Sequence, residues 1–200
     1  MKESGDSDLP RVLLIGDSIR MHYAPLVKKK FDGRVEIVEI PENGGDSGNI
    51  KVNLDKWLKL ARSESLSIIH FNCGLHDIKR QFNQETNQQP IESYEINLKE
   101  IVAHLKEKTK AKLIWATTTP VMYERHHARK GFDRFEEDVE QYNEVATSIM
   151  QENNIPINDL NKVIKDDIVH KCLRPDGVHM KKRGNKLLAN AVVEFLKSYL

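Results

Sequence analysis

The stretch from Arg11 to Ser18 reads RVLLIGDS and decides the prediction of the fold. After its opening arginine it is a short run of β-branched and apolar residues, which is typical of a strand buried on both faces of a parallel sheet. Gly16 ends this run, and Asp17 and Ser18 follow as residue types that often start helices. The stretch therefore predicts a buried strand that turns sharply into a helix.

Further strand-like runs alternate with helical patterns along the rest of the chain. The predicted strands are 35–40, 66–71, 112–117 and a weak fifth at 155–157, where a proline suits the edge of a sheet. Apolar residues recur at helical spacing over 54–61, 94–105, 132–149 and 188–196. We therefore predict an α/β protein, a three-layer sandwich around a parallel sheet of about five strands, with a flavodoxin-like arrangement. Residues 11–200 form its single domain, and residues 1–10 are expected to be a flexible lead-in.

Composition excludes several classes of protein. Hydrophobic residues make up 39% of the 200 residues and charged residues 30%, with a net charge of +1. This balance suits a soluble globular protein and predicts no nucleic-acid partner, and no apolar run is long enough for a membrane span. The polar start of the chain carries no signal-peptide core. That fits a cytoplasmic protein, and it fits equally well an exported one whose leader has been removed.

The cysteines and histidines predict neither a disulfide framework nor a metal site. Two cysteines, Cys73 and Cys172, are expected to be buried free thiols, with a disulfide between them as the alternative if the protein is exported. His126 and His127 are adjacent, so in a helix or a strand their side chains point apart. No spaced histidine pair completes a metal site, and we expect no cofactor.

Polar clusters follow each of the first four predicted strands. They are Gly16–Ser18, Asn43–Asn49, Asn72–Asp77 and Thr117–Pro120. In a parallel sheet the carboxyl ends of the strands lie at one edge, and ligand sites form just beyond them. The four clusters are therefore expected to share one rim.

The tripeptide Gly-Asp-Ser occurs three times, at 5–7 in the polar lead-in, at 16–18 and at 45–47. A serine on a tight turn between a strand and a helix exposes its hydroxyl, and the helix N-terminus favours negative charge. Only Ser18 has this setting, because Ser47 follows the turn-forming residues 41–44 and is expected to lie in a flexible loop. The alternative for Ser18 is a simple helix cap.

Asp176 and His179 form the third motif, Asp-Gly-Val-His. An aspartate three residues before a histidine can accept a hydrogen bond from the ring N–H and so orient the other ring nitrogen toward a nucleophile. An ordinary surface turn is the alternative interpretation. In combination with Ser18, the motif predicts a Ser-His-Asp triad.

In their order along the chain, these motifs resemble the blocks of the SGNH (GDSL-like) hydrolase family, over nearly the whole sequence. The resemblance implies the SGNH hydrolase fold, Ser18 as nucleophile, and Asp176 and His179 as the rest of the triad. It also implies an oxyanion hole formed by the backbone N–H groups of Ser18 and Gly45 and by a side chain from the third block.

The third block departs from the family pattern Gly-x-Asn-Asp. This chain has Gly74-Leu75-His76-Asp77, so His76 takes the place of the asparagine, while Asn72 lies four residues earlier. We expect His76 to be the third oxyanion donor and Asn72 to tie neighbouring loops together, with the opposite assignment as the alternative.

The combined prediction is a serine esterase that hydrolyses small acyl esters, O-acetyl groups above all, through an acyl-enzyme. The expected partner is a small-molecule ester, such as an acetylated carbohydrate or a lysolipid. Two alternatives stay open: an O-acyltransferase that uses the same triad, and a non-catalytic flavodoxin-like module that binds an anion at the Ser18 turn.

Overall fold

Five parallel strands form the central sheet of the computed structural model, which describes residues 9–200. They are β1 (Arg11–Ile15), β2 (Glu36–Glu39), β3 (Ile68–Phe71), β5 (Lys112–Ala116) and β7 (Ile157–Asn158). Their order across the sheet is β2-β1-β3-β5-β7, and every neighbouring pair is parallel. The predicted α/β class and parallel sheet are confirmed. The predicted lead-in, residues 1–10, lies mostly outside the described residues.

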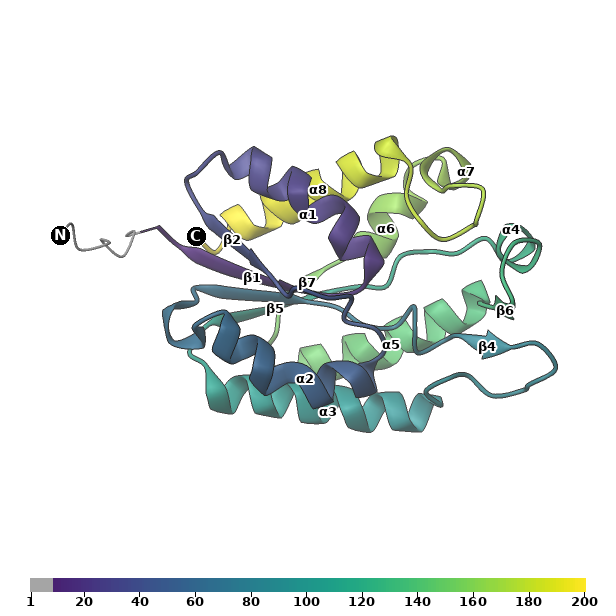
Figure 1. Ribbon diagram of the computed structural model, residues 1–200, viewed down its shortest axis with the longest axis horizontal. Helices are drawn as coiled ribbons and strands as arrows, with labels where there is room; N and C mark the ends of the chain where they lie inside the picture. The colour runs from purple at the N-terminus through teal and green to yellow at the C-terminus, as the bar shows by residue number, and fades with distance from the viewer. Residues whose placement is uncertain (1–8) are drawn as a thin grey trace.

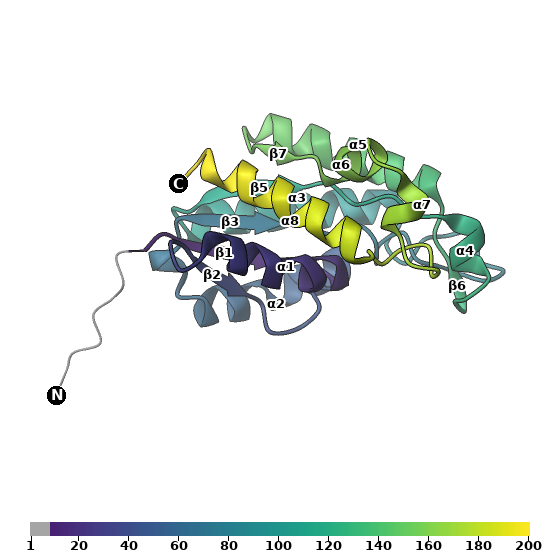
Figure 2. The same ribbon diagram turned by 90° about the horizontal axis from the view of Figure 1, so that it is seen from above.

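Helices cover both faces of this sheet (Figures 1 and 2). One face carries α1 (Ser18–Phe31), α6 (Leu160–Lys165), α7 (Val169–Cys172) and α8 (Lys182–Lys197), which pack against one another. The other face carries α2 (Ser47–Leu60), α3 (Ile91–Lys108) and α5 (Glu136–Glu152). Shorter elements are the 3₁₀ turn η1 (Ser63–Ser65), α4 (Tyr123–His127), and the strands β4 (Arg80–Gln81) and β6 (Phe132–Asp133), which pair with each other.

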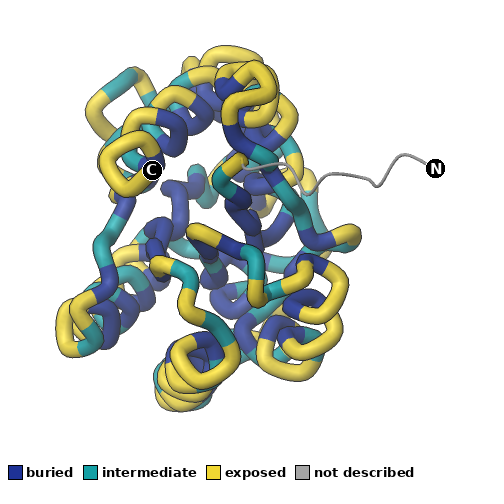
Figure 3. Tube along the Cα trace, turned by 90° about the vertical axis from the view of Figure 1, so that its left-hand side faces the viewer, coloured by how far each residue is buried: buried dark blue, intermediate teal, exposed yellow. Residues whose placement is uncertain are grey.

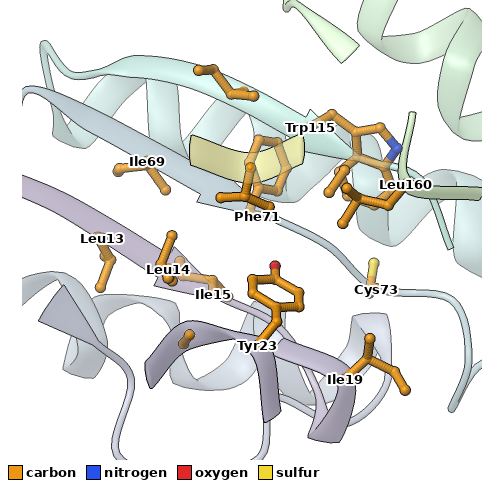
Figure 4. Packing of buried hydrophobic residues seen from close by; sticks show 14 of the residues in the cluster. Leu13, Leu14, Ile15, Ile19, Tyr23, Ile69, Phe71, Cys73, Trp115 and Leu160 are labelled. Carbon is orange, nitrogen blue, oxygen red and sulfur yellow. The ribbon is translucent and has the colours of Figure 1, made fainter. Parts of the chain in front are cut away.

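The core lies between the sheet and these two helical layers. All five residues of β1 are buried, as the apolar run predicts, and the tube in Figure 3 shows buried chain in the interior and exposed chain around it. Figure 4 shows the packing beside β1, where the side chains of Phe71 and Trp115 meet edge to face with ring centroids 5.1 Å apart. This packing holds the strand ends, and the turns that follow them, in fixed positions.

The chain order places a topological switch point between β1 and β3. After β1 the chain moves to β2 on one side, and after β2 it crosses to β3 on the other side. Helices α1 and α2, which begin these two connections, therefore lie on opposite faces. At such a point the turns diverge and leave space for a ligand. The turn after β1 contains Ser18, and the turn after β3, the neighbouring strand, contains the third block.

Two local predictions are wrong. Residues 43–49 are not simply a loop, because Asp46 caps α2 and Ser47 is its first residue. The apolar stripe over 132–149 does not begin in a helix, since residues 132 and 133 form β6 and α5 starts at Glu136. The spacing of Phe132 and Phe135 from Val139 mimics a helical period, which is why the sequence pattern predicts a helix there.

Cys73 and Cys172 are both buried and free, as expected of two thiols. Within residues 9–200, no helix is long and apolar enough to cross a membrane.

Candidate active site

Ser18 occupies the first turn of α1, directly beyond β1. The Asp17 side chain caps the helix by accepting a hydrogen bond from the N–H of Ile19 at 2.8 Å. The second turn approaches this one closely: the N–H of Gly44 donates to the Gly16 carbonyl at 3.0 Å, and a Cβ atom on Gly44 would lie 2.8 Å from that carbonyl oxygen, so glycine is needed at position 44. The Ser18 side chain is half-buried and faces the loop before α8.

The predicted triad residues lie in one hydrogen-bonded chain. Oγ of Ser18 lies 3.0 Å from Nε2 of His179, and Nδ1 of His179 lies 2.7 Å from Oδ2 of Asp176. Burial alone would raise the pKa of Asp176, but hydrogen bonds from the His179 ring and from the N–H groups of Val178 and His179 outweigh it and lower that pKa. An ionised Asp176 keeps the Nδ1 proton on His179, which leaves Nε2 free to accept the proton of Ser18.

A tight turn presents Asp176 and His179 together. The N–H of Arg174 donates to the His179 carbonyl at 2.7 Å, which closes the turn, and the φ of Gly177 is +71°. A Cβ atom on Gly177 would lie 2.4 Å from the Met122 carbonyl oxygen, so only glycine fits. The Asp-Gly-Val-His spacing thus reflects a backbone turn pressed against the segment that precedes α4.

The second Gly-Asp-Ser turn lies beside the first. Gly45 has a φ of +67°, and its N–H donates to Oδ1 of Asn43 at 2.9 Å. In this conformation the predicted oxyanion donor is therefore occupied by a neighbouring side chain. Ser47 is fully buried, with its N–H donating to Oδ1 of Asp77 at 2.8 Å and its Oγ accepting from Nδ2 of Asn97 at 3.1 Å.

The third block separates its two candidate donors. Nδ2 of Asn72 donates to the Ala116 carbonyl at 2.6 Å, so this amide ties β3 to β5. His76 instead lines the same cavity as Ser18 and His179. Burial lowers the pKa of His76, with Arg134 adding to the effect and Asp17 opposing it, which favours a neutral ring that keeps one N–H to donate.

The cavity has a volume of about 230 Å³. Its walls come from the first turn, Asn43, the third block, the β6 region and the triad loop, and they consist of Asp17, Ser18, Asn43, Leu75, His76, Lys130, Phe132, Arg134, Val178 and His179. Sequence patterns singled out only part of this wall. Arg134 and Lys130 acquire their place in the wall through the fold alone, whereas Asn43 begins one of the four polar clusters.

Two histidines outside the predicted motifs support the triad loop. The His22 ring, one turn after Ser18, meets the His179 ring edge to face with centroids 5.5 Å apart. His126 is buried, and its Nδ1 lies 3.2 Å from the Asp176 carbonyl oxygen. Helix α4, which contains His126, therefore packs against the loop that carries Asp176 and His179.

No cluster of metal-binding side chains occurs in the part of the chain that the structure describes. The chemistry available is that of a nucleophilic hydroxyl, an imidazole, a carboxylate and the donors around them.

Comparisons with known proteins agree with this fold. The model of the GDSL-like Lipase/Acylhydrolase family matches residues 14–187. A lipase/acylhydrolase from Enterococcus faecalis has a similar fold with a TM-score of 0.76, 20% sequence identity, and coverage of 95% of this chain and 96% of that one. An acetylxylan esterase from Geobacillus stearothermophilus gives a TM-score of 0.71 at 20% identity, covering 92% and 93%. Among curated protein sequences, none matches.

Proposed function

The chain belongs to the GDSL-like lipase/acylhydrolase family and is a carboxylic-ester hydrolase, and on that premise we propose that it removes short acyl groups, acetyl above all, from hydroxylated small molecules. The observation that carries the proposal is the hydrogen-bonded chain from Ser18 through His179 to Asp176. The same chain argues against a non-catalytic module that binds an anion at the Ser18 turn, because such a module has no use for an oriented imidazole.

In the proposed mechanism, Ser18 attacks the acyl carbon while Nε2 of His179 takes its proton. The tetrahedral intermediate collapses, His179 returns the proton to the leaving alkoxide, and an acyl-enzyme remains on Ser18. Water then repeats the sequence, with His179 again as the base, and releases the carboxylic acid. Asp176 stays ionised throughout and stabilises the imidazolium that forms in each half-reaction.

The oxyanion is held by N–H groups around the Ser18 hydroxyl. We assign the backbone N–H of Ser18, which makes no hydrogen bond with residues 9–200, and a ring N–H of His76. Gly45 joins them once the Asn43 side chain turns away from its N–H, which a substrate entering the cavity can bring about. Asn72 is assigned a supporting role, because its amide is engaged with the end of β5.

The size of the cavity supports a short acyl group. About 230 Å³ accommodates an acetyl or propionyl ester with part of its alcohol, and only three of the ten wall residues, Leu75, Phe132 and Val178, are apolar. Two proteins of similar structure are acetylxylan esterases, which supports a carbohydrate alcohol here. The same mostly polar wall disfavours the long acyl chain of a lysolipid.

The test is a series of 4-nitrophenyl esters of increasing chain length together with acetylated sugars, assayed with the wild type and with Ser18→Ala. We expect kcat/KM to be highest for acetate or propionate and to be lost in Ser18→Ala. A preference for long chains would overturn the substrate class. Activity that survives in Ser18→Ala would overturn the mechanism.

A further inference from the structure

Arg134 is a buried arginine in the wall of the cavity that contains Ser18 and His179. It follows β6, and its side chain is 6% exposed. Its Nε donates to the Leu75 carbonyl, and its guanidinium carbon lies 5.0 Å from the centroid of the Phe132 ring. These two contacts fix the plane of the guanidinium against the third block.

The charge of Arg134 is not matched by a contacting carboxylate. Three arginines are buried among residues 9–200: Arg11 pairs with Glu36 at 2.8 Å, Arg20 pairs with Glu39 at 2.9 Å, and Arg134 has no carboxylate within 4.0 Å. Asp17 and Asp176 act on Arg134 only from a longer distance. A buried guanidinium without a direct counter-charge is costly, so it calls for an anion that arrives from outside the chain.

The unused donors of Arg134 remain open to the cavity. Its two terminal nitrogens carry four of its five N–H groups, and they make no hydrogen bond within the described part of the chain. Both terminal nitrogens also keep some exposure to solvent. Because Arg134 lines the cavity, these donors have their solvent contact there.

A second cation lines the same cavity. Lys130 is half-buried and has no ion pair within residues 9–200. The one carboxylate in the cavity wall is Asp17, whose Oδ1 is engaged by the N–H of Ile19. The cavity wall therefore carries two cations and one carboxylate. Neither cation is needed to stabilise the oxyanion, because the N–H groups assigned above do so.

We propose that Arg134, assisted by Lys130, binds a carboxylate or phosphate group that the substrate carries close to its ester bond. The planar fork of a guanidinium matches these two anions through paired hydrogen bonds. This inference rests on the proposed esterase function and narrows its substrate class from neutral acetylated alcohols to acidic ones.

The experiment compares pairs of esters that differ in charge. On the alcohol side, an O-acetylated methyl glucoside is compared with the matching glucuronoside and with the matching 6-phosphate. On the acyl side, 4-nitrophenyl hexanoate is compared with the 4-nitrophenyl monoester of adipic acid. In the wild type we expect kcat/KM for at least one acidic ester to exceed that of its neutral partner about tenfold or more, which charge-assisted hydrogen bonds can supply.

Variants then assign the preference to Arg134. In Arg134→Gln the ratio of acidic to neutral kcat/KM should fall to about one, mainly through KM, and Arg134→Lys should keep part of it. Arg183→Gln is the matched control, because Arg183 pairs with Asp167 at 2.8 Å and does not line the cavity. It should keep the full ratio.

Two results would overturn the inference. One is a wild type that prefers the neutral member of every pair, which needs no variant to fold. The other is an Arg134→Gln variant that loses kcat equally on acidic and neutral esters, since that would make Arg134 an oxyanion donor or a structural cation. Neither result touches the proposed function, which fails separately if Ser18→Ala retains activity on the neutral esters.

Discussion

The two Gly-Asp-Ser turns share their local structure and differ in their surroundings. In both turns the aspartate caps a helix: Asp17 accepts from Ile19, and Asp46 accepts from Asn49. In both turns the serine is the first helical residue. Ser18, however, meets His179 at 3.0 Å, whereas Ser47 is fully buried. The tripeptide therefore encodes a helix start, and the rest of the fold decides whether its serine is presented.

Long-range contacts bury the second serine. Asp77 accepts from the N–H of Ser47, Asn97 donates to its Oγ, and Gln88 donates to Oδ2 of the neighbouring Asp46. The residues that approach the first turn are instead those of the triad loop. The second turn thus stabilises the frame, while we propose that the first turn carries the chemistry.

Exchanging each serine for alanine gives the largest expected difference. Ser18→Ala should lower kcat by about 10⁶-fold, because the members of a catalytic triad act as one unit. Ser47→Ala should keep activity within about tenfold, yet lower the free energy of unfolding by about 1–3 kcal/mol, because the Asn97 amide loses its acceptor. Steady-state kinetics and denaturant unfolding of both variants measure the contrast. A dead Ser47→Ala beside an active Ser18→Ala would reverse the assignment.

Asp176→Asn should have the next largest effect. The amide cannot hold the Nδ1 proton of His179 as the carboxylate does, so the ring adopts the wrong tautomer and kcat should fall about 10⁴-fold. His179→Ala should approach the loss seen in Ser18→Ala. The kinetics of the two single variants and of the double variant check this. Losses that multiply fully in the double variant would show that the residues do not act as a unit.

His76→Ala should lower kcat about 10²–10³-fold with little change in KM, as expected when one oxyanion donor is removed. Asn72→Ala is the matched variant from the same block. It should chiefly destabilise the fold, since it breaks the contact with the Ala116 carbonyl. If Asn72→Ala loses kcat and His76→Ala does not, the two roles are exchanged.

Asp77 gives the smallest predicted effect, through the pH dependence of stability. Burial raises its pKa to about 7 from an ordinary value of 3.8, and its Oδ2 has no hydrogen-bond partner within residues 9–200. Between these two pH values the folded state holds a proton on Asp77 that the unfolded state releases. The contribution of Asp77 to the free energy of unfolding is therefore complete below about pH 4 and is lost as the pH rises through about 7.

Asp77→Asn should remove this contribution. The free energy of unfolding of the wild type, relative to that of the variant, should fall between pH 4 and pH 7, as measured by urea denaturation at several pH values. An unchanged difference across that range would mean that Asp77 is ionised in the folded protein throughout.

Much of this architecture could be predicted from the sequence. The run 11–15 marks a buried strand because apolar residues without alternation suit only a strand covered on both faces. The three residues of the proposed triad come from two short motifs, 16–18 and 176–179. The helix at Ser47 was missed because the glycines around it indicate a turn, while its cap depends on Asp46. Arg134 was missed because its neighbour Leu75 lies 59 residues away, and no local pattern reports such a contact.

Covalent labelling of the nucleophile distinguishes Ser18 from Ser47 without any assumption about the substrate. A fluorophosphonate that reacts with activated serines is incubated with the wild type, and the denatured protein is digested with trypsin. Cleavage after Arg11, Arg20, Arg34 and Lys51 places Ser18 and Ser47 in different peptides. We expect one label, on Ser18 in the peptide 12–20, which is lost in Ser18→Ala and retained in Ser47→Ala. A label on Ser47, or labelling that persists in Ser18→Ala, would contradict it.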